Sequence, residues 1–161
     1  MNNTPKTALD ICNMALAKLG EPPIAALNPA GLLPSRLCYM HYHPCRRDVL
    51  CANSWTFAKR TVTLAEPEQS FAYFIHQLPM DALRVLAVSV PTWTLRGRTI
   101  WCEQERIRLE YLTDVEDVET FSEDFVKALT LCLAIKLCIP LTNSATTRQA
   151  LTVEYNNLML P

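Results

Sequence analysis

The sequence predicts an α+β fold that is mainly helical, with about four helices and an inserted antiparallel sheet. Apolar residues recur at helical spacing near both ends of the chain, and the middle changes to strand-like runs rich in Val, Ile, Thr and aromatic residues. Prolines and glycines separate these stretches. For 161 residues we expect a single domain over 1–161, with helical parts at 4–54 and 120–160 and a β-rich insertion at 56–112.

The first helix is predicted by its ends. Thr4 can serve as N-cap with Pro5 at the first helical position, where the missing N–H costs nothing. Gly20 can adopt the left-handed conformation that ends a helix, and the prolines that follow forbid its continuation. The proline-rich stretch 21–33 is therefore expected to be a stiff, extended connector.

A second helix is predicted over 34–53, because core-type residues recur there at steps of three and four. Pro44 falls inside this helix and predicts a kink near 40–43, since it removes one backbone hydrogen bond. The predicted core stripe of this helix consists of Cys38, Tyr42, Cys45, Val49 and Ala52.

An antiparallel sheet is predicted for the middle of the chain. Polar and apolar residues alternate strictly over 106–111, which is typical of a strand with one exposed face. Arg96-Gly97-Arg98 suits a hairpin turn between two strands. The expected strands cover 56–64, 70–75, 83–90, 99–103 and 106–111.

The C-terminal part is predicted to form two helices. Thr120 and Glu123 have the spacing of a capping box, and Pro140 is expected to stop the third helix. That helix is apolar on nearly all sides, so it lies at the centre of the fold or is covered by another subunit. Thr142 or Asn143 can cap the last helix. The expected inner face of this last helix consists of Leu151, Tyr155 and Leu158. In the core of the protein we expect Val49, Phe125 and Ile135 to be buried.

Composition excludes several classes of protein. Only 19% of residues are charged, against a usual share of about 25%, and half are hydrophobic, so a disordered chain is excluded. Fifteen Lys and Arg residues are balanced by sixteen Asp and Glu residues, which argues against a dedicated duplex-DNA binder. The apolar run 128–141 is interrupted by Lys136 and is shorter than the ~20 residues of a membrane span. With no secretory signal at the start, we expect a soluble protein made inside the cell.

Four possible metal ligands, Cys38, His41, His43 and Cys45, lie within eight residues. On a helix the first, second and fourth share a face, so one alternative is a zinc site made of Cys38, His41 and Cys45. A nucleophilic Cys45 activated by His41 is a second alternative. Both cysteines also belong to the apolar stripe, which favours plain packing with no metal, no cofactor and no catalytic residue. The odd total of seven cysteines, with no CxxC pair, predicts reduced thiols.

Other chemistry finds less support. The three glycines are too scattered for a phosphate-binding loop. The acidic segment 114–124 could hold paired carboxylates for acid–base work, but it is more typical of a solvated stretch that supplies negative charge to a helix N-terminus. Basic pairs such as Arg96 with Arg98 alternate with tryptophans. That pattern fits a nucleic-acid stacking surface in composition, and ordinary strand faces explain it better.

Five short segments carry a family resemblance: ALAKLGEPPI (15–24), RDVL (47–50), WTFA (55–58), LPMD (78–81) and RVL (84–86). They resemble segments of the tail tubular protein A family, the head–tail adaptors of short-tailed phages, and of related phage adaptors. The stretch at 15–24 resembles the opening of that family, and 47–50 with 55–58 is similar to the end of its second helix and the exit into its sheet. A segment of related phage adaptors is similar to 78–81 running into 84–86.

The resemblance implies a non-enzymatic virion protein, made in the host cytoplasm and located in the neck or tail. Its implied partners are the portal protein and the tail tube or nozzle protein. It implies a homo-oligomeric ring, expected to be dodecameric on the portal and monomeric or a small oligomer when isolated. Genomic DNA would pass through the lumen without specific binding, and no membrane is involved. The residues expected at interfaces are Glu21, Pro22, Pro23, Arg46, Arg47, Leu131 and Leu137.

Overall fold

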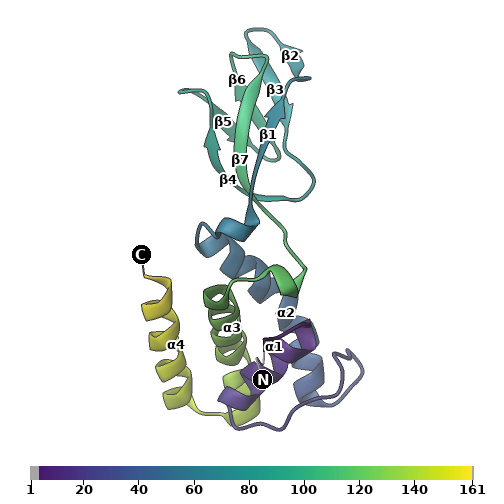
Figure 1. Cartoon of the computed structure of the whole chain (residues 1–161), viewed down its shortest axis with the longest axis vertical. Helices are drawn as coiled ribbons and strands as arrows, with labels where there is room; N and C mark the ends of the chain where they lie inside the picture. Colours follow the sequence, from purple (N-terminus) through teal and green to yellow (C-terminus); the bar gives the residue numbers. More distant parts are fainter. Residues whose placement is uncertain (1–3, 161) are drawn as a thin grey trace. The chain divides into compact units, whose positions relative to one another are not determined.

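The computed structural model describes residues 4–160, and these form an α+β fold of four α-helices and two antiparallel sheets (Figure 1). The fold class predicted from the sequence is therefore confirmed. The chain divides into two compact units. The helical unit comprises the residues up to Asn53 and from Glu116 onward, and the sheet unit comprises Ser54–Val115.

The helical unit is built around one central helix. It contains α1 (Ala8–Lys18), α2 (Leu33–Ala52), α3 (Glu123–Thr142) and α4 (Ala145–Met159). Each of the other three helices packs against α3. Phe125, Leu129 and Leu133 of α3 are fully buried, because apolar side chains on almost every side of this helix are covered. Of the three residues expected in the core, Val49 and Phe125 are buried, whereas Ile135 is only half-buried.

By length and composition alone, α3 is also long and apolar enough to cross a membrane, and it is the one such helix in 4–160. This differs from the expectation for the apolar run 128–141, because α3 begins five residues before that run, at Glu123. More than half of the most apolar stretch of α3 is buried against the rest of the unit. That burial is typical of a core helix, which passes the same test of length and composition.

Local capping explains where α1 begins and ends. The helix begins after Thr7 rather than Thr4, because Thr7 and Asp10 form a capping box. The Thr7 Oγ1 accepts from the Asp10 N–H at 3.2 Å. In return, the Asp10 carboxylate accepts from the Thr7 N–H at 2.9 Å. Gly20 has φ +73°, the left-handed conformation expected from the sequence. The N–H groups of Gly20 and Glu21 donate to carbonyls of the last turn, which completes the C-terminal cap.

Proline does not interrupt either long helix. Pro44 is exposed within α2, whose residues remain helical on both sides of it; the expected bend there stays a prediction. Pro140 was expected to stop α3, but the helix continues to Thr142. The last turn is held by two other bonds: the Thr142 Oγ1 donates to the Cys138 carbonyl at 2.7 Å, and Asn143 N–H donates to the Ile139 carbonyl.

The caps near α3 and α4 also differ from the expected residues. Ser122, not Thr120, caps α3, and its Oγ accepts from the Phe125 N–H at 3.3 Å. Thr120 belongs instead to a short 3-10 helix, Val118–Thr120. Ser144, rather than Thr142 or Asn143, caps α4. Asn143 has φ +50° and makes the turn between the two helices, which leaves Ser144 in the capping position.

The sheet unit contains two antiparallel sheets with strand orders β1-β7-β4 and β2-β3-β6-β5. The Arg96-Gly97-Arg98 hairpin is confirmed, and Gly97 has the positive φ (+59°) that such a turn requires. Residues 56–58, expected as strand, form a 3-10 turn instead. The strand bounds are β1 (Lys59–Leu64), β2 (Glu68–Ser70), β3 (Tyr73–Gln77), β4 (Ala82–Val88), β5 (Thr94–Arg96), β6 (Thr99–Cys102) and β7 (Ile107–Thr113).

The unit has its own apolar core, which contains Ile100, Ile107 and Leu109. The alternation predicted for 106–111 is visible in β7, where Ile107, Leu109 and Tyr111 are buried and Arg108 is exposed. The sheet unit can therefore bury apolar surface without contributions from the helices.

Truncation of Phe125 should destabilise the protein strongly. Phe125→Ala removes a fully buried ring that packs edge-on against the Phe121 ring, with 4.6 Å between the ring centres. We expect a loss of about 3–5 kcal/mol in the free energy of unfolding. Ile135→Ala, at a half-buried position of the same helix, should cost clearly less. Urea denaturation of the two variants measures both values, and equal losses would contradict the placement of Phe125 at the centre of the unit.

Candidate functional site

The cysteines of the predicted zinc or nucleophile cluster face the interior of the helical unit. Cys38 and Cys45 are buried on α2, while His41 is half-buried and His43 is exposed. Each cysteine is hydrogen-bonded to a thiol of another helix, Cys38 to Cys12 and Cys45 to Cys132. Among residues 4–160, no group of three or more His, Cys, Asp and Glu side chains is arranged to hold a metal ion. The geometry thus gives the zinc alternative no support.

The protonation of Cys45 is equally unfavourable for nucleophilic chemistry. Its hydrogen bond with Cys132 and its burial both raise the pKa of the Cys45 thiol. A nucleophilic cysteine needs the opposite, a lowered pKa and a partly exposed sulfur. Burial, with a smaller effect of Lys136, lowers the pKa of His41. The Cys–His alternative therefore lacks the electrostatics that its chemistry requires.

The acidic segment has structural partners. Glu116 lies 3.4 Å from the guanidinium of Arg46, and Asp117 accepts from the Glu119 N–H at the start of the short 3-10 helix. Glu123 and Asp124 occupy the first turn of α3, where negative charge stabilises the helix dipole. Asp124 also pairs with Lys127 at 3.4 Å. These positions agree with the structural interpretation of the segment rather than with paired catalytic carboxylates.

Arg46 is the residue whose role sequence reasoning missed. Expected at an interface, it is fully buried in the helical unit, where it reaches Glu116 at 3.4 Å and the His43 ring at 3.5 Å. Arg46 follows Tyr42 by four residues, so helical spacing places it on the same apolar stripe of α2. This spacing was the signal in the sequence that Arg46 is buried. Leu131 and Leu137, also expected at an interface, are buried in α3. These three residues are thus removed from the accessible surface of the folded chain.

The other four expected interface residues lie closer to the surface. Pro22, Pro23 and Arg47 are exposed, and Glu21 is half-buried. The connector that contains the prolines is fixed to the helices by two side chains that sequence reasoning did not identify. Asn13 of α1 bonds both the N–H and the carbonyl of Ile24, at 2.9 and 3.1 Å. Ser35 of α2 donates to the Ala26 carbonyl at 2.6 Å and accepts from the Asn28 N–H.

Several basic residues of the sheet unit are used in local structure. Arg98 donates to the Ala82 carbonyl at 3.2 Å, and Arg60 donates to the carbonyls of Phe57 and Lys59. The β3–β4 connection is fixed in addition by Asp81. Its carboxylate accepts from the Thr113 hydroxyl at 2.6 Å and from the Tyr111 hydroxyl at 3.3 Å, and these bonds tie the 78–81 segment to β7.

A row of aromatic and guanidinium groups crosses the four-stranded sheet. Trp101 lies on β6, which pairs with β5 on one side and with β3 on the other. The Arg96 guanidinium of β5 lies 4.3 Å from the centre of the Trp101 ring. The centres of the Trp101 ring and the Tyr73 ring of β3 lie 6.3 Å apart. The Trp101 Nε1–H donates to Thr99 at 3.0 Å, which fixes the indole. Arg96 and Tyr73 are exposed, so this row is an accessible surface of the sheet unit as well as a stabilising cross-strand contact.

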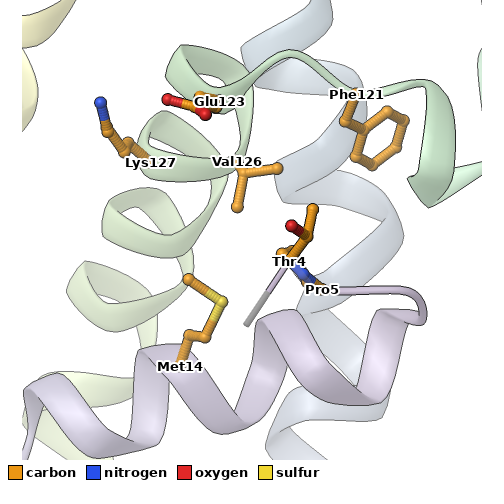
Figure 2. Close-up of a pocket in the computed structure, with 7 residues that line it drawn as sticks. All are labelled: Thr4, Pro5, Met14, Phe121, Glu123, Val126 and Lys127. Carbon is orange, nitrogen blue, oxygen red and sulfur yellow. The ribbon is translucent and has the colours of Figure 1, made fainter. Parts of the chain in front are cut away.

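The helical unit has a hollow between α1 and the start of α3. Met14, Val126 and Phe121 contribute its apolar wall, and Glu123 and Lys127 contribute charged groups at its side (Figure 2). The hollow has a volume of about 330 Å³. Its mixture of apolar wall and charged rim is typical of surfaces that contact other proteins.

No known family model matches the sequence, and no curated protein matches it. Functional inference therefore depends on the surfaces described above and on the short resemblances in the sequence. The helical and sheet units each present accessible groups, whereas the cysteines of the predicted reactive cluster are enclosed.

We expect Cys45 to react slowly with a thiol reagent in the folded protein. Because its pKa is raised and its sulfur is buried, half-exposed Cys51 should be labelled well before it. Time-resolved labelling followed by peptide mass spectrometry measures the order, and denatured protein, in which all seven cysteines should react, is the control. Fast labelling of Cys45, or stoichiometric zinc in metal analysis of the same sample, would restore the enzyme or zinc interpretation.

Proposed function

We propose that this protein is a structural virion protein, a head–tail adaptor that forms a ring joining the portal to the tail tube and surrounding part of the DNA exit channel. The observation that carries the proposal is the division of the chain into a helical unit and a sheet unit, each with its own core and its own accessible groups. An adaptor has to contact different proteins at its two ends, and two independent surfaces meet that requirement.

The segments that resemble phage adaptors support the proposal through their positions. The stretch 15–24 contains the end of α1, its Gly20 cap and the start of the fixed connector. Segments 47–50 and 55–58 lie at the end of α2 and at the turn before β1. Segment 78–81 is the connection that Asp81 anchors. Four of the five segments thus lie where helices and strands begin or end, as is expected if the resemblance reflects a shared chain path. The fifth segment, 84–86, lies within β4.

The near-neutral charge is compatible with this role. A channel wall must let DNA slide, and a strongly basic wall would retain it by releasing counterions. Fifteen basic residues against sixteen acidic ones provide no large excess for such retention. Under this proposal the portal and the tail tube or nozzle protein are the partners, the ring is dodecameric on the portal, and the protein acts in the neck of the virion.

The prolines of the connector should matter more for attachment than for folding. Pro22→Gly with Pro23→Gly gives an exposed segment more conformational freedom, while the Asn13 and Ser35 hydrogen bonds still hold the rest of the connector on the helices. Binding to a partner then has to restore the lost order of residues 22 and 23. We expect weaker retention on portal rings of the same virus in a pull-down, with a small change in melting temperature.

The matched control is Pro91→Gly, at an exposed proline of the sheet unit. It should leave retention on portal rings unchanged. Equal losses of attachment and stability in the double variant would reduce the connector to an element of the fold. A virion reconstruction that places the chain elsewhere, in a tail fibre for instance, would refute the adaptor proposal itself.

A further inference from the structure

Two pairs of cysteine thiols join helices of the helical unit in the part of the chain that the structure describes, residues 4–160. Cys12 of α1 is hydrogen-bonded to Cys38 of α2, and Cys45 of α2 is hydrogen-bonded to Cys132 of α3. All four thiols are free. Each pair thus places two reduced sulfur atoms of different helices within hydrogen-bonding reach, and neighbouring sulfurs are what a disulfide bond requires.

The Cys45–Cys132 pair lies where α2 packs against α3 (Figure 1). Helical spacing extends this contact along both helices, because Asp48 is three residues after Cys45 and Lys136 is four residues after Cys132. Both charged groups act electrostatically on both thiols, so Asp48 and Lys136 lie beside the pair. The two sulfur atoms are therefore positioned by the packing of two long helices rather than by a loop.

The two thiol pairs differ in their access to solvent. Cys12 and Cys38 are both 0% exposed, and Cys45 is 1% exposed, whereas Cys132 is half-buried. A dissolved oxidant can therefore approach Cys132, but it can approach neither member of the first pair. This difference makes the Cys12–Cys38 pair an internal control for a reaction at the Cys45–Cys132 pair.

The hydrogen bond gives the two thiols of the second pair different roles. The bond from the Cys45 thiol lowers the pKa of Cys132, although burial and the Asp48 carboxylate act in the opposite direction. The same hydrogen bond, together with burial, raises the pKa of Cys45. Because the thiolate is the reactive form of cysteine, Cys132 is the thiol that attacks first, and Cys45 keeps its proton until the second step.

We propose that Cys132 and Cys45 form a reversible disulfide that ties α3 to α2 when the protein meets a small-molecule disulfide such as oxidised glutathione. The Cys132 thiolate attacks one sulfur of the oxidant, whose S–S bond breaks and releases a first thiolate. Cys45 then gives up its proton and attacks the Cys132 sulfur of the mixed disulfide, which releases a second thiolate. Two protein thiols are oxidised, and the oxidant is reduced to two thiols that take up the two protons.

This disulfide adds a covalent connection between the two parts of the helical unit. Cys45 precedes the sheet unit in the chain and Cys132 follows it, so the closed loop contains the whole of Ser54–Val115. A crosslink that closes a long loop stabilises a fold mainly by restricting the unfolded chain. Cytosolic thiols keep such a bond reduced and an oxidising environment lets it form, so the stability of the helical unit depends on the redox state of its surroundings. The inference is independent of the adaptor role.

Oxidation of the full chain with excess oxidised glutathione tests the assignment, with alkylation of the remaining thiols and peptide mass spectrometry as the readout. We expect a Cys45–Cys132 disulfide that dithiothreitol reverses, while Cys12 and Cys38 stay reduced in the folded protein. The oxidised protein should melt roughly 5 °C or more above the reduced protein. A different pairing, a Cys12–Cys38 bond that forms as fast, no disulfide, or a melting temperature that does not rise would overturn the proposal.

Substitution of each thiol separates the two steps of the reaction. Cys45→Ala should stop the reaction after the first step, so that Cys132 accumulates as a mixed disulfide with glutathione. Cys132→Ala should leave Cys45 unmodified, because that buried thiol is not reached. The matched control is Cys51→Ala, at another half-buried cysteine of α2, which should form the Cys45–Cys132 bond as wild type does. Circular dichroism of the reduced variants checks that each folds. Glutathione on Cys45 in the Cys132→Ala variant, at the rate seen on Cys132 in the Cys45→Ala variant, would overturn the proposed order of attack.

Discussion

The helical unit depends on one constraint, the need to cover α3. Its side chains are apolar in nearly every direction, so most of the helix has to be shielded from water. Three helices from distant parts of the sequence do this: α1 and α2 come before the sheet unit, and α4 follows α3 directly. The last turn of α3 and the Ser144 cap hold α4 in place, and contacts with α3 give α1 and α2 a common surface to pack on. Burial of the α3 side chains is the largest apolar contribution that the unit contains.

The chain leaves the helical unit after Asn53 and returns at Glu116, and the return is fixed by a buried cation. Arg46 is fully enclosed in α2, and a buried guanidinium is costly unless acceptors surround it. The Glu116 carboxylate is one such acceptor, so the first residue after the insertion is tied to the helix that precedes the insertion. This contact adds to the packing of α1 and α2 on α3, which joins the two parts of the helical unit across 62 intervening residues, Ser54–Val115. Those residues fold around a separate core.

Two surfaces remain accessible outside the two apolar cores. The sheet unit presents the Arg96–Trp101–Tyr73 row, and the helical unit presents the hollow between α1 and the start of α3. Enclosed thiols, in contrast, fill space between helices. Hydrogen bonds and burial raise the pKa of the Cys12 and Cys45 thiols, and the same hydrogen bonds lower the pKa of their partners, Cys38 and Cys132. Accessible surfaces of this kind are compatible with the assembly role proposed above. The proposed adaptor role rests on these surfaces together with the resemblance of the short segments.

The sequence by itself determined the class of fold and several of the positions where helices end and the chain turns. Helical and strand periodicities, Gly20 at the end of α1 and Gly97 in the hairpin depend on residues within a few positions, so they can be read locally. The caps are local as well, Thr7 with Asp10 and Ser122 with the Phe125 N–H, but Thr4 and Thr120 suit a cap equally well by residue type. Only the tertiary structure decided that α3 is covered by other helices of its own chain. It also decided that Leu131 and Leu137 of α3 and Arg46 of α2 are buried within the helical unit. Burial is set by contacts between residues far apart in the sequence, and a local pattern does not contain that information.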